Sequence, residues 1–239
     1  MNNLRLTAVY GWDKIHRDDN IEDDDARFYG LFSAIDTRYS TIEIDVAHVA
    51  SDAAEDLWVW GIGSTQRLMQ RYNLTLRLNG SHAAEDTRQS DDGLLLYTEL
   101  SWTPHATENV FYINGFAGKD NFRSAARDED AGGPLGRTGL LFAARGIGTY
   151  PSAISNRVDE SYGAAIGYQM FFAHNSRHLI IEAGVRSDEG AIDQETAGIA
   201  LQFQRSFAKR FIFQADGFVT AADDQAPSFG IRTEFQVKF

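Results

Sequence analysis

Residues 72–79 read YNLTLRLN, and apolar and polar side chains alternate along the whole stretch. Successive side chains of a β-strand point to opposite faces of the sheet, so this period of two predicts a strand with one apolar face and one polar face. Residues 41–46, TIEIDV, and residues 230–239, GIRTEFQVKF, repeat the pattern on either side. The repetition predicts an all-β chain built from two-faced strands.

The same alternation can be followed through most of the chain, and it predicts twelve strands. Twelve is an even number, as bacterial single-chain barrels require. The four prolines all fall outside the predicted strands, where they interrupt no ladder of hydrogen bonds. The predicted strands are 3–14, 26–36, 39–50, 57–64, 70–80, 93–103, 109–118, 160–173, 177–187, 195–205, 210–220 and 228–239.

The connections between these strands alternate in length and charge. Short connections at 36–39, 64–69, 103–108, 174–176 and 206–209 alternate with longer acidic ones, such as HRDDNIEDDD at 16–25. Basic residues accompany the short set: Arg38, Arg67, Arg177 and Lys209. Short periplasmic turns that alternate with longer outer loops are typical of outer-membrane barrels, so both ends of the chain are expected on the periplasmic side.

The character of the two faces favours a membrane barrel over a large soluble barrel or sandwich, which would turn its apolar face inward. The apolar face carries aromatic residues near strand ends, including Trp58, Tyr72, Trp102 and Tyr168, as a lipid-facing band with aromatic girdles would. The polar face combines opposite charges that could neutralise one another across strands. Its predicted lumen-lining residues are Arg5, Glu43, Asp45, Arg77, Glu99, Glu182, Arg186, Asp216, Arg232 and Glu234.

The last strand, ending in phenylalanine, resembles the terminal strand that Gram-negative outer-membrane proteins present to the barrel-assembly machinery. The resemblance covers some ten residues and implies an assembly signal at Phe235, Val237 and Phe239. It also implies an outer-membrane location, with lipid and lipopolysaccharide as surroundings. The beginning, MNNLRLTAVYGW, has no signal peptide, so an exported protein would have lost its leader before this point.

Composition narrows the remaining classes. The 239 residues carry a net charge of −12, which argues against nucleic-acid binding, and 43% of them are hydrophobic, which permits an ordered fold. The absence of cysteine excludes cysteine-based metal centres and a cysteine nucleophile. No stretch has the roughly 18 consecutive apolar residues of a membrane helix. We expect one domain over residues 1–239, a transmembrane antiparallel up-and-down β-barrel.

Residues 119–159 break the alternation and form a connection of unusual length, which predicts a functional or disordered segment. Its apolar, glycine-punctuated centre predicts a constriction or plug formed by Arg137, Leu140, Phe142, Arg145 and Tyr150. Arg145 would then pair with Glu43, Asp45 or Glu99 on the wall. Two alternatives remain: an extra hairpin above the membrane, or a further membrane strand at 138–148.

Searches for other chemistry find weak signals. The acidic run Asp18–Asp25 lacks the glycine turn and terminal glutamate of an EF-hand, and a solvated loop explains it. His174 and His178 flank a tight turn, where their spacing does not make a metal site. The segment GPLGRTG at 133–139 lacks the Lys-Ser/Thr ending of a phosphate loop. No metal site and no cofactor are predicted.

The sequence favours a channel or porin for passive diffusion of small hydrophilic solutes, with a modest preference for cations because acids exceed bases. One alternative is a non-conducting barrel that acts as an envelope scaffold or as the membrane sleeve of a larger complex. The other is a rim-located hydrolase, for which His48, His82 and Ser81 are the candidates. That class lacks a GxSxG or HExxH signature, so no catalytic residue is predicted.

Overall fold

The computed structural model contains β-strands and the connections between them. It describes residues 3–15, 24–51, 56–84, 91–105, 107–119, 122–123, 157–158, 160–173, 176–189, 194–207, 210–223 and 226–237. Within these ranges no helix is long and apolar enough to cross a membrane.

The described residues form fourteen strands, of which twelve are ten to fourteen residues long and two are two-residue strands. The long strands are β1 (Asn3–Ile15), β2 (Asp24–Asp36), β3 (Ser40–Ser51), β4 (Asp56–Leu68), β5 (Tyr72–Ala84), β6 (Asp91–Trp102), β7 (Val110–Lys119), β10 (Ser161–Phe172), β11 (Arg177–Asp188), β12 (Gln194–Phe207), β13 (Phe211–Ala222) and β14 (Ser228–Val237). The two short ones are β8 (Phe122–Arg123) and β9 (Arg157–Val158).

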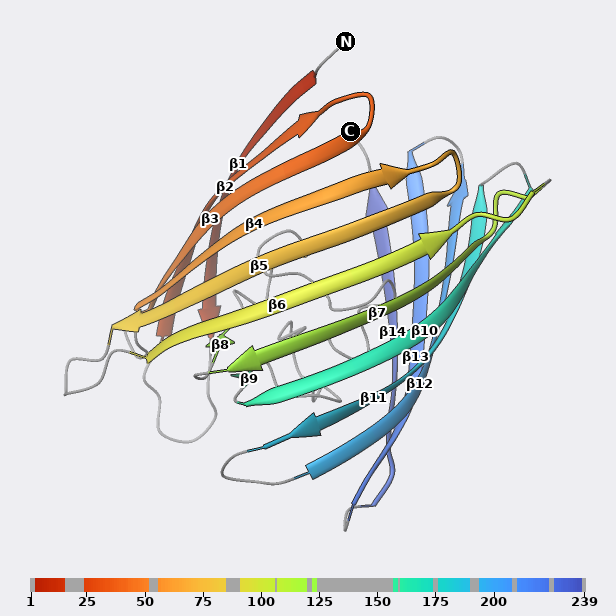
Figure 1. Cartoon of the computed structure of the whole chain (residues 1–239). Coiled ribbons are helices and arrows are strands. Elements are labelled where there is room, and N and C mark those ends of the chain that lie inside the picture. Colours follow the sequence, from red (N-terminus) through yellow and green to blue (C-terminus); the bar gives the residue numbers. More distant parts are fainter. Residues whose placement is uncertain are drawn as a thin grey trace.

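The twelve long strands form one sheet in which every strand pairs with its neighbours in sequence, β1 to β7 and then β10 to β14. Every pairing is antiparallel, so the sheet is an up-and-down meander. Figure 1 shows that this sheet curves strongly, so that β1 and β14 lie at the two ends of a wide arc. The predicted all-β, antiparallel up-and-down fold is confirmed.

All twelve predicted strands exist, and their bounds differ from the prediction by a few residues, with one larger error. The connection predicted at 64–69 is wrong, because β4 continues to Leu68 and pairs with β5 through Ser64↔Leu76 and Leu68↔Tyr72. The residues in this stretch are polar on both faces, but they continue the ladder with β5. The turn itself covers residues 69–71, where Met69 has a φ of 60°.

Residues 119–159 were predicted to form a long connection between two neighbouring strands, and the ladder agrees, except that Lys119 still belongs to β7. β7 pairs directly with β10, through Gly118↔Ser161 and its neighbours. Residues 138–148 lie outside the described ranges, so the alternative that they form a further strand stays a prediction. At the base of the segment, β8 and β9 form a two-residue ladder, Phe122↔Val158 and Arg123↔Arg157, and β8 lies against β5 and β6.

Candidate functional site

Two faces follow from the register of the strands. On β5, Leu76 and Leu78 are exposed on the convex face, whereas the intervening Arg77 turns to the concave side and is half-buried. The same alternation holds for the strands on either side. We call the concave side the inward face and the convex side the outward face.

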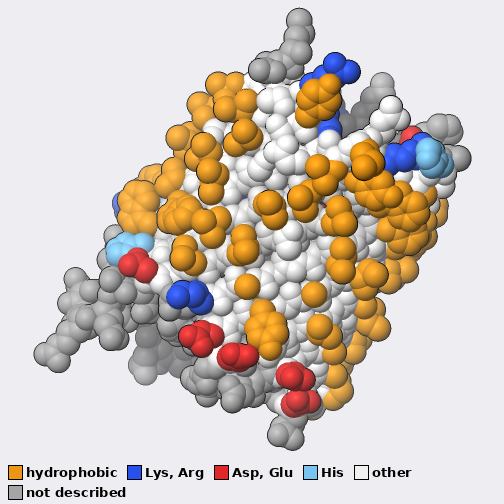
Figure 2. Space-filling view, viewed as in Figure 1, with side chains coloured by type: hydrophobic (Ala, Val, Ile, Leu, Met, Phe, Trp, Pro, Cys, Tyr) orange, Lys and Arg blue, Asp and Glu red, His pale blue; other side chains and the backbone are white. Residues whose placement is uncertain are grey.

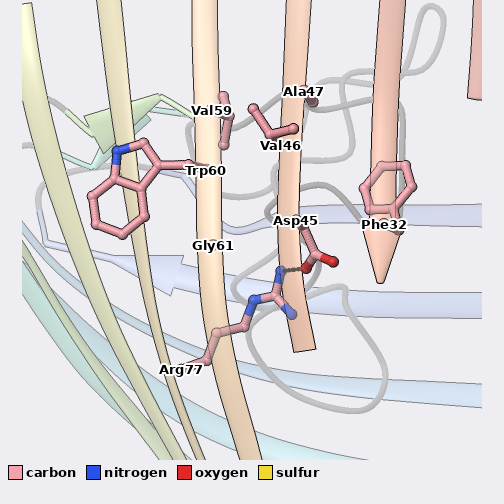
Figure 3. Close-up of a pocket in the computed structure, with 8 residues that line it drawn as sticks. All are labelled: Phe32, Asp45, Val46, Ala47, Val59, Trp60, Gly61 and Arg77. Atoms are coloured by element: carbon pink, nitrogen blue, oxygen red, sulfur yellow. Dashed lines mark hydrogen bonds and ion pairs between the residues drawn. The ribbon is translucent and has the colours of Figure 1, made fainter. Parts of the chain in front are cut away.

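Arg77 of β5 reaches across β4 to join β5 to β3 on the inward face. Its guanidinium donates from Nη1 to Oε2 of Glu43 at 3.3 Å and from Nη2 to Oδ2 of Asp45, both on β3. Its Nε donates to Oδ1 of Asn79, at 2.8 Å, on its own strand. Figure 3 shows the Arg77 side chain extending from β5 towards Asp45. One cation is thus held by two carboxylates from a strand two positions away in the sheet.

Gly61 of β4 makes this reach possible, and Gly63 lies beside the same cluster. A Cβ atom on Gly61 would lie 2.7 Å from the Asn79 amide oxygen and 2.8 Å from Arg77 Nη2. A Cβ atom on Gly63 would lie 3.4 Å from the Glu43 carboxylate. Arg77 therefore lies across the bare backbone of β4, and the charge cluster depends on small residues in the strand between its partners.

A second arrangement of the same kind joins β7, β10 and β11. Tyr112 of β7 lies over Gly167 of β10, where a Cβ atom would lie 2.1 Å from Cζ and 2.2 Å from the hydroxyl oxygen of Tyr112. The Tyr112 hydroxyl donates to Oε2 of Glu182 on β11, with 2.5 Å between the oxygens. Glu182 is fully buried and Tyr112 is 3% exposed. A buried carboxylate needs such donors, because an unpaired charge in a dry site is costly.

Arg186 of β11 and Phe116 of β7 form a third contact, across Gly163 of β10. The Arg186 guanidinium carbon lies 5.8 Å from the centre of the Phe116 ring, within the range of a cation–π contact. Its Nη2 also lies 3.5 Å from the Ser161 hydroxyl oxygen. Gly163 of β10 lies under the Phe116 ring and leaves room for it.

The remaining predicted lumen-lining residues also lie on the inward face where their side chains are described. Arg5 donates from Nε to Oδ2 of Asp36 at 3.0 Å. Glu99 accepts the Tyr97 hydroxyl at 2.9 Å, and Asp216 accepts both contacts from the Gln214 amide, at 2.9 and 3.1 Å. Glu234 is half-buried, and the Arg232 side chain lies outside the described ones, although its backbone pairs with Asp216.

Sequence reasoning missed the apolar and aromatic part of this face. Phe32, Ala47 and Val59 form a buried cluster beside Asp45 and Arg77 (Figure 3). Tyr97, Tyr112 and Phe116 were also missed, although Tyr97 stands at an alternate position to Glu99 on β6, and Tyr112 and Phe116 stand at alternate positions to Asn114 on β7. That alternation could have found them, but an apolar residue was assumed to face outward.

Several predicted site residues cannot be placed. The constriction residues Arg137, Leu140, Phe142, Arg145 and Tyr150 lie outside the described ranges, as does Phe239. Phe235 and Val237, the other two residues of the predicted assembly signal, face outward and are exposed. Glu43 and Asp45, two of the predicted partners of Arg145, both already bind Arg77. Arg145 would have to share these carboxylates with Arg77.

The hydrolase candidates do not come together. Ser81 is buried on the inward face, whereas the next residue, His82, is exposed on the outward face and lies 2.6 Å from Oδ1 of Asp92. His48 faces outward and stacks on Trp58, with 4.3 Å between ring centres. A serine and a histidine on opposite faces of one strand cannot form a nucleophile–base pair. Among the described residues, no group of three potential metal ligands is found.

The outward face has the character of a lipid-facing surface. Figure 2 shows hydrophobic side chains spread across it, with charged groups near its margins. Two rows of neighbouring aromatic rings border it: Tyr10, Tyr29, His48 and Trp58 near the long connections, and Tyr72, Trp102, Phe111 and Tyr168 near the turns. On β5 the rows are ten residues apart, or about 24 Å along the membrane normal at a tilt of about 45°. That height matches the apolar band of outer-membrane barrels.

A sheet with apolar side chains on its convex face and charged side chains on its concave face has the construction of a transmembrane β-barrel wall. No protein-family model and no curated protein sequence matches the chain. Solved structures do match it, and they are Gram-negative outer-membrane porins. The chain has the fold of this class of outer-membrane β-barrel proteins.

Three of these structures illustrate the likeness. OccK3 (OpdO) of Pseudomonas aeruginosa is 9% identical with a TM-score of 0.58, and the match covers 99% of this chain and 69% of that one. OccAB3 of Acinetobacter baumannii is 11% identical with a TM-score of 0.61, over 99% and 65%. A BenF-like porin from Pseudomonas fluorescens Pf-5 is 12% identical with a TM-score of 0.59, over 98% and 63%. The chain thus spans about two thirds of their length, and at these identities the likeness establishes the fold.

Proposed function

We propose that the chain forms the wall of an outer-membrane channel for passive diffusion of small hydrophilic solutes. The observation that carries this proposal is the separation of the two faces, since charged side chains such as Arg77 and Glu43 point inward while the outward face is apolar. An aqueous path through a membrane needs such an interior. The porin fold of the matched structures supports the same function.

We further propose that the channel prefers cations. The predicted lumen-lining residues with described side chains include more acids than bases: Glu43, Asp45, Glu99, Glu182, Asp216 and Glu234 against Arg5, Arg77 and Arg186. Arg77 offsets two of these acids, and Glu43 keeps 40% of its side chain exposed. A ring of acidic side chains favours cations electrostatically in a narrow pore.

Residues 119–159 are proposed as the segment that narrows this path. Support comes from the inward face itself, whose members include side chains with very low exposure, such as Glu182 at 0% and Asp216 at 2%. β8 lies at the base of the segment and contacts β5 and β6, so this base lies close to the sheet.

The same burial favours a second candidate, a barrel that does not conduct and serves as an envelope scaffold or as the sleeve of a larger complex. In both cases we propose outer-membrane lipid and lipopolysaccharide as the surroundings of the outward face. We propose no enzymatic activity, because the candidate pair Ser81 and His82 points to opposite faces.

Conductance in planar lipid bilayers tests the proposal. The refolded protein is expected to give single-channel steps with a reversal potential on the cation-selective side in a salt gradient. The double variant Glu43→Gln, Asp45→Asn is expected to lose part of that selectivity. Deletion of residues 136–150 is expected to raise conductance severalfold while the barrel stays folded. Silence from both the parent and the deletion variant would reject the channel and support the scaffold.

A further inference from the structure

Two arginines lie directly opposite each other on the outward face, at the turn end of the sheet. Arg177 is the first residue of β11, and it pairs with Arg205 near the end of β12. Both side chains are exposed, and both stand at alternate positions to outward residues such as Ile181 and Leu201. We propose that this arginine pair binds the phosphate of an anionic phospholipid headgroup. The inference deepens the lipid surroundings proposed above and does not depend on conduction.

Two like charges at directly opposite positions call for a counter-ion. The Cβ atoms of such residues in an antiparallel ladder are about 4.5–5.5 Å apart, and like charges there destabilise a sheet. In the part of the chain that the structure describes, neither guanidinium has a hydrogen-bond, ion-pair or ring partner. The neighbouring strands and turns, residues 161–181 and 196–215, contain no Asp or Glu. The protein therefore supplies no acid near this pair.

Other arginines at the turn end of the sheet have acceptors within the protein. Arg5 donates from Nε to the Asp36 carboxylate at 3.0 Å, and Arg67 donates from Nη1 to a turn carbonyl at 3.5 Å. The arginine pair differs from them, because its exposed guanidiniums lie on the face that meets the membrane. An acceptor for the pair must come from outside the described protein, and lipid is the molecule that lies against this face.

A phosphodiester fits the arginine pair in charge and in geometry. Each guanidinium presents its N–H donors as a planar fork that matches two phosphate oxygens. A phosphodiester has two unesterified oxygens that share one negative charge, so one headgroup can accept from both guanidiniums. The adjoining turn adds the exposed Arg210, and basic side chains at a membrane margin attract anionic lipid.

The surroundings of the arginine pair suit the acyl chains of the same lipid. Phe172 and Phe213 flank the pair in the ladder. Beyond them, Phe207, Phe211 and Phe235 form a cluster with 5.6–5.8 Å between ring centres. A charged pair inside an aromatic margin matches a molecule with an anionic head and apolar tails. The turns are expected on the periplasmic side, where the leaflet is phospholipid, so we assign the headgroup to a phospholipid and not to lipopolysaccharide.

Native mass spectrometry of the refolded protein in a maltoside detergent tests the site, with phosphatidylglycerol as the probe. The double variant Arg177→Gln, Arg205→Gln is expected to bind the first phosphatidylglycerol molecule about tenfold or more weakly than the parent. The matched control is Arg38→Gln, Arg67→Gln, which loses the same charge at the same end of the sheet and should bind like the parent. Equal weakening in both double variants would reduce the effect to net charge and overturn the site.

Two competitors identify the source of the phosphate. Neither lipid A nor inorganic phosphate, at a concentration equal to that of phosphatidylglycerol, is expected to displace it from the parent. Displacement by lipid A would overturn the phospholipid assignment and place this end of the sheet in the outer leaflet. Displacement by inorganic phosphate would show a site for a soluble anion and would equally overturn the proposal.

Urea unfolding gives a second readout, in which the order of stability should reverse. Without phospholipid, Arg205→Gln should be at least as stable as the parent, because the contact between like charges is removed. With phosphatidylglycerol added, the parent should gain stability through binding and the variant should gain less. The lipid-free measurement also reports that the variant folds. A parent whose stability does not change with phosphatidylglycerol would overturn the proposal. No conductance enters these measurements, so their failure would leave the proposed channel untouched.

Discussion

The Tyr112 side chain on β7 passes over Gly167 of β10 and reaches Glu182 on β11, where 2.5 Å separates the hydroxyl oxygen from the carboxylate oxygen. Three consecutive strands of the sheet are thereby joined by one side chain. Arg77 does the same across β4, where it joins β5 to β3. In both cases a glycine in the middle strand provides the space, and an acid two strands away is the partner.

Tyr112→Phe should destabilise the sheet by about 1–3 kcal/mol, because it removes a donor from a fully buried carboxylate while it keeps the ring over Gly167. Urea unfolding of the refolded protein in detergent measures this change. Tyr162→Phe is the matched control, since Tyr162 faces outward and is 53% exposed. Equal stability of the two variants would show that the Tyr112 hydroxyl contributes nothing to the fold.

Gly167→Ala should destabilise the sheet by more than the addition of a single methyl group suggests. The added methyl group would occupy the place of the Tyr112 ring, so the ring must move and its bond to Glu182 must lengthen or break. We expect a loss of about 1–3 kcal/mol from overpacking, in addition to the hydrogen bond. Gly217→Ala is the control, because the nearest atoms to its Cβ are 3.8 Å away or more. A Gly167→Ala variant as stable as Gly217→Ala would contradict the close approach.

The alternation of side chains explains why the sequence predicted so much of this fold. A period of two identifies both a strand and its two faces, so twelve strands and the inward position of Arg77 and Glu182 could be predicted without knowing any partner. The error at 64–69 arose because Ser64, Thr65 and Gln66 are polar on both faces. Their pairing with β5 is a property of two strands together, since Thr65 and Thr75 contact through their hydroxyl oxygens at 3.0 Å.

Contacts across the sheet could not be predicted, because they depend on register and on the residue in the strand between. Arg145 was predicted to pair with Glu43, Asp45 or Glu99, and it lies outside the described residues. Arg77 holds Glu43 and Asp45, and it reaches them across β4, where Gly61 leaves room. The sequence shows the glycines of β4, but it does not show which side chain passes over them. Inward aromatic residues were missed for a related reason. An apolar side chain can lie on either face of the sheet when a glycine in the neighbouring strand leaves room for it.

Arg77→Gln should make the channel more selective for cations and the sheet less stable. The change leaves Glu43 and Asp45 without their shared cation, and loss of one partner of a largely buried pair costs about 3–5 kcal/mol. Reversal potentials in a salt gradient measure the selectivity, and urea unfolding measures the stability. Arg67→Gln is the control, because Arg67 lies exposed near the turn end of β4. A reversal potential unchanged in Arg77→Gln would place the ion path away from this cluster.

Leu76→Arg should test the lipid-facing assignment of the outward face. Leu76 is 48% exposed and lies midway between the two aromatic rows on β5, so an arginine there should cost about 2–4 kcal/mol in a bilayer. Leu68→Arg, near the turn end, should cost about 0–1 kcal/mol, because its guanidinium can reach the interface. Unfolding in liposomes provides the comparison. If both variants lost the same stability, the apolar band would not be centred on Leu76.

Labelling of engineered cysteines should establish which end of the strands faces the cell exterior. The turns carry the basic residues and the long connections are acidic, and long connections of outer-membrane barrels lie outside. We therefore expect Ala53→Cys, in the connection between β3 and β4, to react with a membrane-impermeant maleimide on intact cells. Met69→Cys, in the turn after β4, should react after the outer membrane is permeabilised and not before. The chain has no cysteine of its own, so each signal comes from one site. Reaction of Met69→Cys on intact cells, with Ala53→Cys protected, would invert the topology and place the acidic connections in the periplasm.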